Sequence, residues 1–493
     1  MSIETPVTAA PPAAAEGLGA LEARVRHDLA CLDYPAKPWV EPIATDVEGP
    51  VLDCALIGGG QFGVALAFGL KREHVSNIMV YDRSPAGVEG PWMSFARMDM
   101  LRTPKDLTGP DLGVGSLTFR AWYEAQHGSA GWEALKRIPR PVWMDFLRWY
   151  RRVLELPVQN DTEVIAVDPV SPKLFRLTML HQGKCQTVHA RTVVYCSGAE
   201  GSGARIVPGF IREALPARLY AHTNDAIDFD ALKGKRIGVL GAGASAFDNA
   251  ATALEMGAAQ AHLCFRRAQM PVQNPRRWME FSGFLAHYPE LSDAERWAYM
   301  HRLYDISQPP PEPTFRRATS LPGFHLHPST PWQKVSVTPD GQVEVQTPQG
   351  AMHFDFVIAA TGIAVDLNLR AEFAGVLPGM ALWRDRYSPP AELRDERLGG
   401  FPYLGRYCDL LEKTPGAAPW AQRVFTITRG ATLSMGPSAA SNSNMKYTAP
   451  RIIAGVTRQL FLDGRQAYYE RFAGTTHDEL DRGEVEKKLR QAA

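Results

Sequence analysis

The chain has few cysteines and no cysteine pair. Its 493 residues include six cysteines, none of them in a Cys-x-x-Cys spacing. Such pairs are typical of redox-active dithiols and zinc sites. His325 and His327 alternate as on one face of a strand, but the sequence points out no further ligand for a metal beside them. We therefore predict no metal, and we do not expect electrons to pass to a protein dithiol.

An excess of charge and a long apolar run are absent as well. The 53 basic and 53 acidic residues cancel, so there is no electrostatic footprint for nucleic acid or an anionic membrane. Asp53, Gln61 and several glycines interrupt the apolar stretch 51–70, which argues against a membrane span. Residues 1–17 lack the basic patch and apolar block of a secretory signal. We expect a cytoplasmic protein with small-molecule partners, and the sequence leaves a homo-oligomer open.

A glycine-rich turn follows the first apolar segment, 51–57. Gly58, Gly60 and Gly63 complete a Gly-x-Gly-x-x-Gly motif, and a helical pattern follows over 64–71. Such glycines allow a tight turn and a close approach to a pyrophosphate at the helix N-terminus. Asp82 ends the next apolar segment, where a carboxylate can accept hydrogen bonds from an adenosine ribose. A glycine turn in an unrelated sheet is the alternative, but the complete pattern favours a dinucleotide site.

A second turn of the same kind lies in mid-chain. The apolar segment 236–240 runs into Gly241 and Gly243, with Ala246 at the third glycine position. The following strand ends in Arg266-Arg267 where the first motif has an acid. Two guanidinium groups suit a 2′-phosphate, which favours NADPH over NADH, although the arginines could also be a solvated strand end.

Each predicted dinucleotide domain has a closing strand as well as an opening strand. The segments 192–198 and 354–362 are both apolar and both end in small residues. The fold class is therefore α/β, with two Rossmann-like dinucleotide-binding domains, the NADPH domain inserted into the FAD domain, and a small irregular cap. We expect Pro450 to open a helix that runs through Phe461. The predicted units are an N-terminal extension and helix (1–48), the first part of the FAD domain (49–225), the NADPH domain (226–365) with an irregular insertion (268–335), the second part of the FAD domain (366–472) and a tail (473–493).

Two dinucleotide sites on one chain constrain its chemistry. One site holds a hydride donor, so the other should hold its acceptor, FAD. A disulfide reductase would pass electrons to a cysteine pair, and this chain has none. Two classes of flavoenzyme therefore remain: a simple reductase or dehydrogenase, and an oxygen-using monooxygenase. A structural flavin-binding protein is a third alternative.

Further motifs resemble the class B flavin monooxygenases over about residues 50–465. They are Gly90-Pro-Trp92, the segment Leu101-Arg-Thr-Pro-Lys105 and Ala360-Thr361-Gly362. The Baeyer–Villiger fingerprint is missing apart from His222, and Pro104 stands where the dimethylaniline-type enzymes carry Asn. The nearest group is the bacterial N-hydroxylating amino-acid monooxygenases, including the nitrosuccinate-forming type. A Baeyer–Villiger or sulfide monooxygenase remains the alternative.

The resemblance implies a mechanism and a set of site residues. NADPH would reduce FAD, and a C4a-hydroperoxyflavin would oxygenate a small substrate, most simply an amine or amino acid, with O2 as co-substrate. Lys105 and Asn444 are the catalytic candidates, with loop packing and turn formation as their alternatives. Arg276-Arg277 or Arg316-Arg317 could clamp a substrate carboxylate, against the alternative of a solvated loop. The cofactor-binding candidates are Gly58, Gly60, Gln61, Gly63, Asp82, Arg83, Trp92, Thr103, Gly241, Gly243, Ala244, Ser245, Arg266, Arg267, Thr361 and Gly362.

Overall fold

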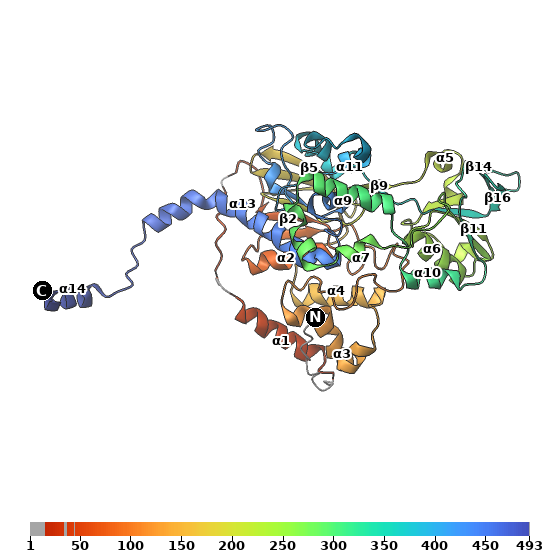
Figure 1. The fold of residues 1–493 in the computed structure, drawn as a ribbon. Helices are drawn as coiled ribbons and strands as arrows, with labels where there is room; N and C mark the ends of the chain where they lie inside the picture. Colours follow the sequence, from red (N-terminus) through yellow and green to blue (C-terminus); the bar gives the residue numbers. More distant parts are fainter. Residues whose placement is uncertain (1–14, 34–36, 44, 493) are drawn as a thin grey trace, which may run out of the picture.

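The computed structural model describes residues 15–33, 37–43 and 45–492. The first 14 residues of the predicted N-terminal extension lie outside these ranges. A central body carries β2 (Cys54–Ile57), β5 (Thr162–Ser171) and α2 (Gln61–Arg72), and a second lobe carries α6 (Ala244–Glu255), β11 (Arg236–Leu240) and β14 (Lys334–Val337) (Figure 1). The two lobes are joined by the antiparallel pair β9 (Gly203–Arg205) and β18 (Ile363–Val365).

The body is built on a five-stranded parallel sheet. Its order is β19 (Val424–Thr426), β8 (Val193–Tyr195), β2 (Cys54–Ile57), β3 (Ile78–Tyr81) and β4 (Val158–Gln159). Strand β2 is buried along its whole length, as its apolar sequence predicts. Asp53 divides the predicted strand 51–57 in two, and its carboxylate accepts a hydrogen bond from buried Arg191 at 2.8 Å. The preceding residues instead join a second sheet of the body, ordered β1 (Val51–Leu52), β7 (Lys184–Ala190), β6 (Leu174–His181) and β5 (Thr162–Ser171).

The second lobe repeats the parallel design. Its sheet has the order β10 (Tyr220–His222), β17 (Phe356–Ala359), β11 (Arg236–Leu240), β12 (Gln260–Cys264) and β13 (Phe324–His327). A three-stranded antiparallel sheet follows, with β14 (Lys334–Val337), β15 (Val343–Thr347) and β16 (Gly350–Phe354). Since β10 pairs with β17, this lobe begins before residue 226, the boundary that the sequence predicted.

The segment 268–335 is not irregular, and this corrects the sequence prediction. It contains α7 (Pro275–Met279), α8 (Ser282–His287), α9 (Asp293–Ile306), α10 (Glu312–Thr319) and β13. Strand β13 pairs in parallel with β12, so the segment does continue the sheet. Trp297 of α9 packs on Trp383 of the body, and its indole donates a hydrogen bond to the Leu393 carbonyl at 2.7 Å. The predicted cap is therefore a run of helices, in which α9 packs on the body and α10 packs on α6 of the second lobe.

Helices cover both lobes. Helix α2 (Gln61–Arg72) follows β2, α6 (Ala244–Glu255) follows β11, and α1 (Leu18–Cys31) packs on α3 (Phe119–Ala134) beside α4 (Arg140–Val153). Shorter helices are α5 (Gly209–Arg212), α11 (Glu396–Gly399) and α12 (Thr432–Met435). No helix in the described ranges is both long and apolar enough to cross a membrane.

The last long helix begins earlier than its proline predicts. Helix α13 spans Met445–Ala473 and holds Pro450 in its interior rather than at its first position. The start is set instead by a 3-10 turn over Asn442–Asn444, which leads directly into the helix. Pro450 has no N–H to offer the carbonyl four residues before it. Beyond α13, the chain leaves the body and ends in the exposed helix α14 (Arg482–Ala492) (Figure 1).

Candidate functional site

The first glycine turn has the geometry that a bound pyrophosphate requires. Gly58 has φ of +116°, a conformation that favours glycine. A Cβ on Gly63 would lie 1.9 Å from the Gly58 carbonyl oxygen, so the close packing of α2 on the turn requires glycine there. A Cβ on Gly60 would meet only the Gly90 Cα, at 4.0 Å. Gly60 is therefore open to a ligand, and the N-terminus of α2 points its free N–H groups into the same space.

Asp82 holds this turn from the end of β3. Its carboxylate accepts hydrogen bonds from the Gly59 N–H at 2.6 Å and from the Ser84 N–H at 2.7 Å. The side chain is buried, and each carboxylate oxygen can accept a further hydrogen bond from a ribose hydroxyl. The neighbouring Arg83 is exposed, and its guanidinium lies 3.9 Å from the Glu200 carboxylate.

These groups line one cavity of about 310 Å³ at the carboxyl ends of the parallel strands. Two buried side-chain oxygens in its wall, Gln61 Oε1 and Ser197 Oγ, have no hydrogen-bond partner in the described part of the chain. Unpaired buried polar atoms are costly, so they fit a ligand that supplies partners. The residues present therefore fit FAD. Six predicted residues line this cavity, namely Gly58, Gly60, Gln61, Asp82, Arg83 and Trp92.

Sequence reasoning missed part of this wall. Val164 of β5 and the loop from Ser197 to Gly201 after β8 also line the cavity. The small-residue turn after the strand 193–195 could have indicated the loop, because ligands bind beyond the carboxyl ends of such strands. Val164 carries no comparable signal, since it lies in an antiparallel strand of the other sheet.

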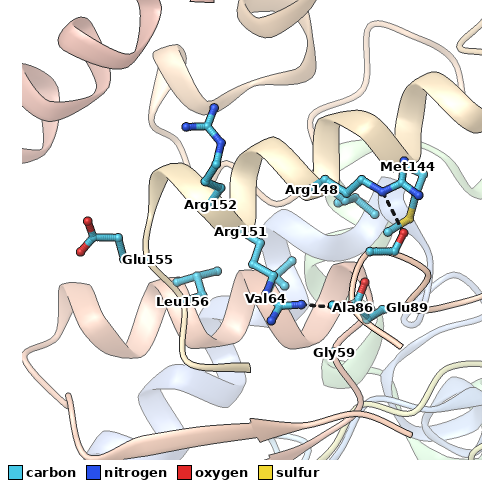
Figure 2. Close-up of a pocket in the computed structure, with 13 residues that line it drawn as sticks. Gly59, Val64, Ala86, Glu89, Met144, Arg148, Arg151, Arg152, Glu155 and Leu156 are labelled. Atoms are coloured by element: carbon cyan, nitrogen blue, oxygen red, sulfur yellow. Dashed lines mark hydrogen bonds and ion pairs between the residues drawn. The ribbon is translucent and has the colours of Figure 1, made fainter. Parts of the chain in front are cut away.

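A second cavity lies on the other side of the same turn, toward α4 (Figure 2). It measures about 590 Å³, and arginines of α4 extend over it. Arg151 pairs with Glu89 at 2.5 Å, and Arg148 donates to the Gly87 carbonyl at 2.8 Å. Because these two cations already have partners, we interpret them as fixing the loop 86–90 beside the glycine turn.

The second glycine turn opens onto a cavity of about 530 Å³. Gly241, Gly243, Arg266, Arg267 and Thr361 line it, as the motif predicts. Arg266 is exposed and has no ion pair among the described residues. Arg267 donates to the Asp305 carbonyl at 3.2 Å, which fixes its guanidinium beside the end of α9. Ala244 and Ser245 form the first turn of α6, where free N–H groups suit a phosphate.

The linker residues behind this cavity have structural hydrogen bonds. His222 donates from Nε2 to the Gly362 carbonyl at 2.9 Å and accepts from the Asn224 N–H at 3.1 Å. Burial lowers the pKa of His222, which favours this neutral tautomer. The Thr361 hydroxyl donates to the Ile206 carbonyl. His222 and Gly362 therefore link β10 to the chain that returns to the body.

A larger cleft, about 1130 Å³, separates the two dinucleotide sites. Thr103 and the loop before α13 line its body side, while Phe265 and α7 line the side of the second lobe. A nicotinamide and an isoalloxazine can meet only between the two sites. This cleft is therefore the candidate active site.

The two predicted catalytic residues lie outside the wall of this cleft. The Lys105 ammonium donates to the Trp132 carbonyl at 2.7 Å and lies 4.5 Å from the centre of the Trp132 ring. Asn444 is buried next to Ser443, which does line the cleft, and its Oδ1 has no partner among the described residues. The structure brings Thr103 to the cleft and directs Lys105 away from it.

Of the two predicted arginine clamps, one lines the cleft and the other does not. Arg276 and Arg277 line the cleft. Arg317 instead pairs with Glu255 at 2.6 Å and Asp99 at 3.0 Å, and exposed Arg316 pairs with Glu312. Only the first pair of arginines can reach a substrate.

The comparison with curated proteins identifies the family. The chain is 45% identical over 458 residues to an FAD-dependent urate hydroxylase from Xanthomonas campestris, which covers 93% of this chain and 96% of that protein. The chain belongs to this family of FAD-dependent hydroxylases. Residues 55–200, which include the first glycine turn, also match a family model described as FAD-NAD(P)-binding.

Solved structures of amine hydroxylases share the fold of this hydroxylase. An ornithine hydroxylase from Pseudomonas aeruginosa is 16% identical, with 83% of this chain and all of that chain covered at a TM-score of 0.65. An FAD-bound cadaverine monooxygenase from Erwinia amylovora is 15% identical, with coverage of 83% and 95% and a TM-score of 0.62. The predicted fold class and superfamily are confirmed. The protein is a flavin-dependent monooxygenase, and FAD and a nicotinamide dinucleotide are its cofactors.

His325 and His327 lie on β13 and stack beside His262 of β12 rather than around a common point. Within the described ranges, no group of three or more His, Cys, Asp or Glu side chains is arranged to hold a metal.

Proposed function

We propose that this monooxygenase hydroxylates urate or a closely related anionic purine derivative, with NADPH as the electron donor. The observation that carries this proposal is the 45% identity to a urate hydroxylase over almost the whole of both chains. The cofactor-binding residues that line the two dinucleotide cavities are part of the proposal, whereas Lys105 is left out because its ammonium is held by Trp132 away from the cleft. A cytoplasmic location and a homo-oligomer stay predictions from the sequence.

The charges of the cleft support an anionic substrate. Arg137, Arg276 and Arg277 line it without an ion pair to a described carboxylate, whereas Glu280 is the one lining carboxylate that is similarly unpaired. A protonated amine would meet more guanidinium groups than carboxylates, and like charges repel. This distribution favours urate over the amino-acid amine that the sequence resemblance implied.

The chain's own residues bind, orient and shield the reactants. Bound reduced flavin supplies the chemistry that activates oxygen for transfer to the substrate. The cleft wall contributes prolines and the apolar side chains of Phe265, Met270 and Phe315, which limit water around the reacting atoms. Thr103 and the serines before α13 offer hydroxyl groups on the opposite side. No protein nucleophile is required.

Product analysis tests the proposal. The holoenzyme is given NADPH, labelled O2 and one of urate, ornithine, cadaverine or aspartate, and products and hydrogen peroxide are measured. We expect urate to accelerate NADPH oxidation and to gain one labelled oxygen atom, with little peroxide. An oxygenated amine without urate turnover would instead establish N-oxygenation. Peroxide as the sole oxygen product with every compound would contradict a monooxygenase role for these substrates.

A further inference from the structure

One wall of the cleft combines an unpaired cation with an unpaired carboxylate. Arg276 lies in α7, and its Nη1 donates to the Pro437 carbonyl of the body at 2.5 Å. The N-cap Asn274 accepts from the Arg276 N–H at 3.1 Å, which fixes the start of the helix. None of the ion pairs in the described ranges includes Arg276. The rest of its guanidinium fork is therefore free to bind a ligand in the cleft.

A second arginine disfavours the charged form of Arg276. Arg429 of the body acts on Arg276 as a like charge, and it too has no ion pair among the described residues. Burial, with Arg429 as the next contribution, lowers the pKa of Arg276. Glu280 and Tyr304 act in the opposite direction, but neither forms an ion pair with Arg276 within the described chain. An anion bound beside Arg276 would offset both its burial and the like charge of Arg429.

Glu280 provides a complementary acceptor one turn further along. It follows the last residue of α7 and lines the same cleft. Burial raises its pKa, whereas Arg277, a hydrogen bond from Ser443 and Arg276 act to lower it. A carboxylate has about four lone-pair positions, so Glu280 can accept from a ligand in addition to Ser443.

We propose that Arg276 and Glu280 together recognise one edge of an anionic heterocycle that carries N–H groups. Arg276 donates to an anionic oxygen of the ligand, and Glu280 accepts a hydrogen bond from a ring N–H. This inference rests on the proposed function, and it assigns substrate selection to α7 rather than to either dinucleotide-binding turn. A ligand that lacks the anionic oxygen loses the first contact, and one methylated at the recognised nitrogen loses the second.

Binding to the oxidised holoenzyme tests the arginine. Urate is titrated without NADPH, and the dissociation constant is measured by calorimetry. Loss of a hydrogen bond to a charged group costs about 1.5–3 kcal/mol, so we expect Arg276→Met to weaken urate binding about 10- to 100-fold. Arg276→Lys keeps a donor for the Pro437 carbonyl but not the planar fork, and we expect an intermediate loss. Arg302→Met on α9 removes an exposed arginine that pairs with Asp305, and it should bind urate as the wild type does.

N-methylated urates test the carboxylate. We expect methylation of one ring nitrogen to weaken wild-type binding about tenfold, the cost of one hydrogen bond to a charged group. In Glu280→Ala the ratio of the dissociation constants for methylated and unmethylated urate should fall to near one. FAD content and folding, followed by circular dichroism, should stay unchanged. Equal penalties in both proteins for every ring position, or an unchanged urate affinity in Arg276→Met, would overturn this inference alone. A wild-type protein that binds no urate would overturn it together with the proposed function.

Discussion

Arg266 and Arg267 differ in a way that the sequence does not reveal. Arg267 is held by main-chain carbonyls at the end of α9, whereas Arg266 is exposed at the rim of the cavity lined by Gly241. Arg266 is therefore better placed to pair with a 2′-phosphate. We expect Arg266→Ala to raise the KM for NADPH about 10- to 100-fold, the cost of a charge-assisted hydrogen bond, with the KM for NADH nearly unchanged.

Steady-state kinetics with both nucleotides measure this difference. Arg212→Ala serves as the matched control, because Arg212 is an exposed arginine of the same lobe outside the cavity. Parallel increases for NADPH and NADH in Arg266→Ala would mean that the residue positions the dinucleotide without reading its 2′-phosphate.

Strand β13 adds a histidine cluster to the second sheet. His327 Nε2 lies 3.0 Å from His262 Nδ1, the His325 ring stacks on the other side, and Gln260 Oε1 lies 3.1 Å from His262 Nε2. The charge of Arg236 acts on His262 as well, and the Phe354 ring lies 5.6 Å from the His262 ring. Burial, with His325, His327 and Arg236 adding to it, lowers the pKa of His262 from 6.5 to about 4.

This cluster predicts a loss of stability in mild acid. Because the folded-state pKa is below the unfolded value, the neutral ring is favoured by folding, and stability is lost as pH falls from about 6.5 toward 4. One pKa unit corresponds to 1.36 kcal/mol, so we expect a loss of roughly 2 kcal/mol between pH 7.5 and 5.0 from His262. Urea unfolding at both pH values measures it. In His262→Gln this part of the pH dependence should disappear, while the part due to carboxylates remains.

The same strand shows what sequence patterns could and could not predict. Both glycine turns and their flanking elements follow from local spacing, because a tight turn constrains residues that are neighbours in the chain. Strand β13 lies beside β12 only after a connection of four helices, and no local pattern reports such a pairing. Lys105 illustrates the limit for sites, since its partner Trp132 is fixed by the packing of α3. The unpaired state of Arg276 likewise depends on which carboxylates the fold brings near.

At the scale of the whole molecule, Arg317 is one of the residues that connect the two lobes. Arg317 of α10 donates to the Arg97 carbonyl at 2.8 Å and pairs with Asp99 at 3.0 Å, both in the body. It also pairs with Glu255 at the end of α6 at 2.6 Å, and its side chain is only 15% exposed. Because α10 contributes Phe315 to the cleft wall, these contacts fix that wall relative to the body, and we expect them to help set the distance between the two cofactors.

Replacing Arg317 therefore has two expected consequences. Arg317→Met leaves Asp99 and Glu255 without their cation, while buried Asp248 keeps Arg102. We expect the free energy of unfolding to fall by about 2 kcal/mol, less than for a fully buried pair because Asp99 and Glu255 are partly exposed. We also expect slower flavin reduction by NADPH with little change in FAD content, because the two lobes lose their fixed spacing while the FAD cavity keeps its wall. Urea unfolding and anaerobic stopped-flow absorbance measure the two effects.

Arg316→Met is the control, since its pair with Glu312 is exposed on both sides (77% and 71%) and should contribute less than about 1 kcal/mol. If both variants reduce flavin at the wild-type rate, the ion pairs of Arg317 stabilise α10 without setting the approach of the two cofactors.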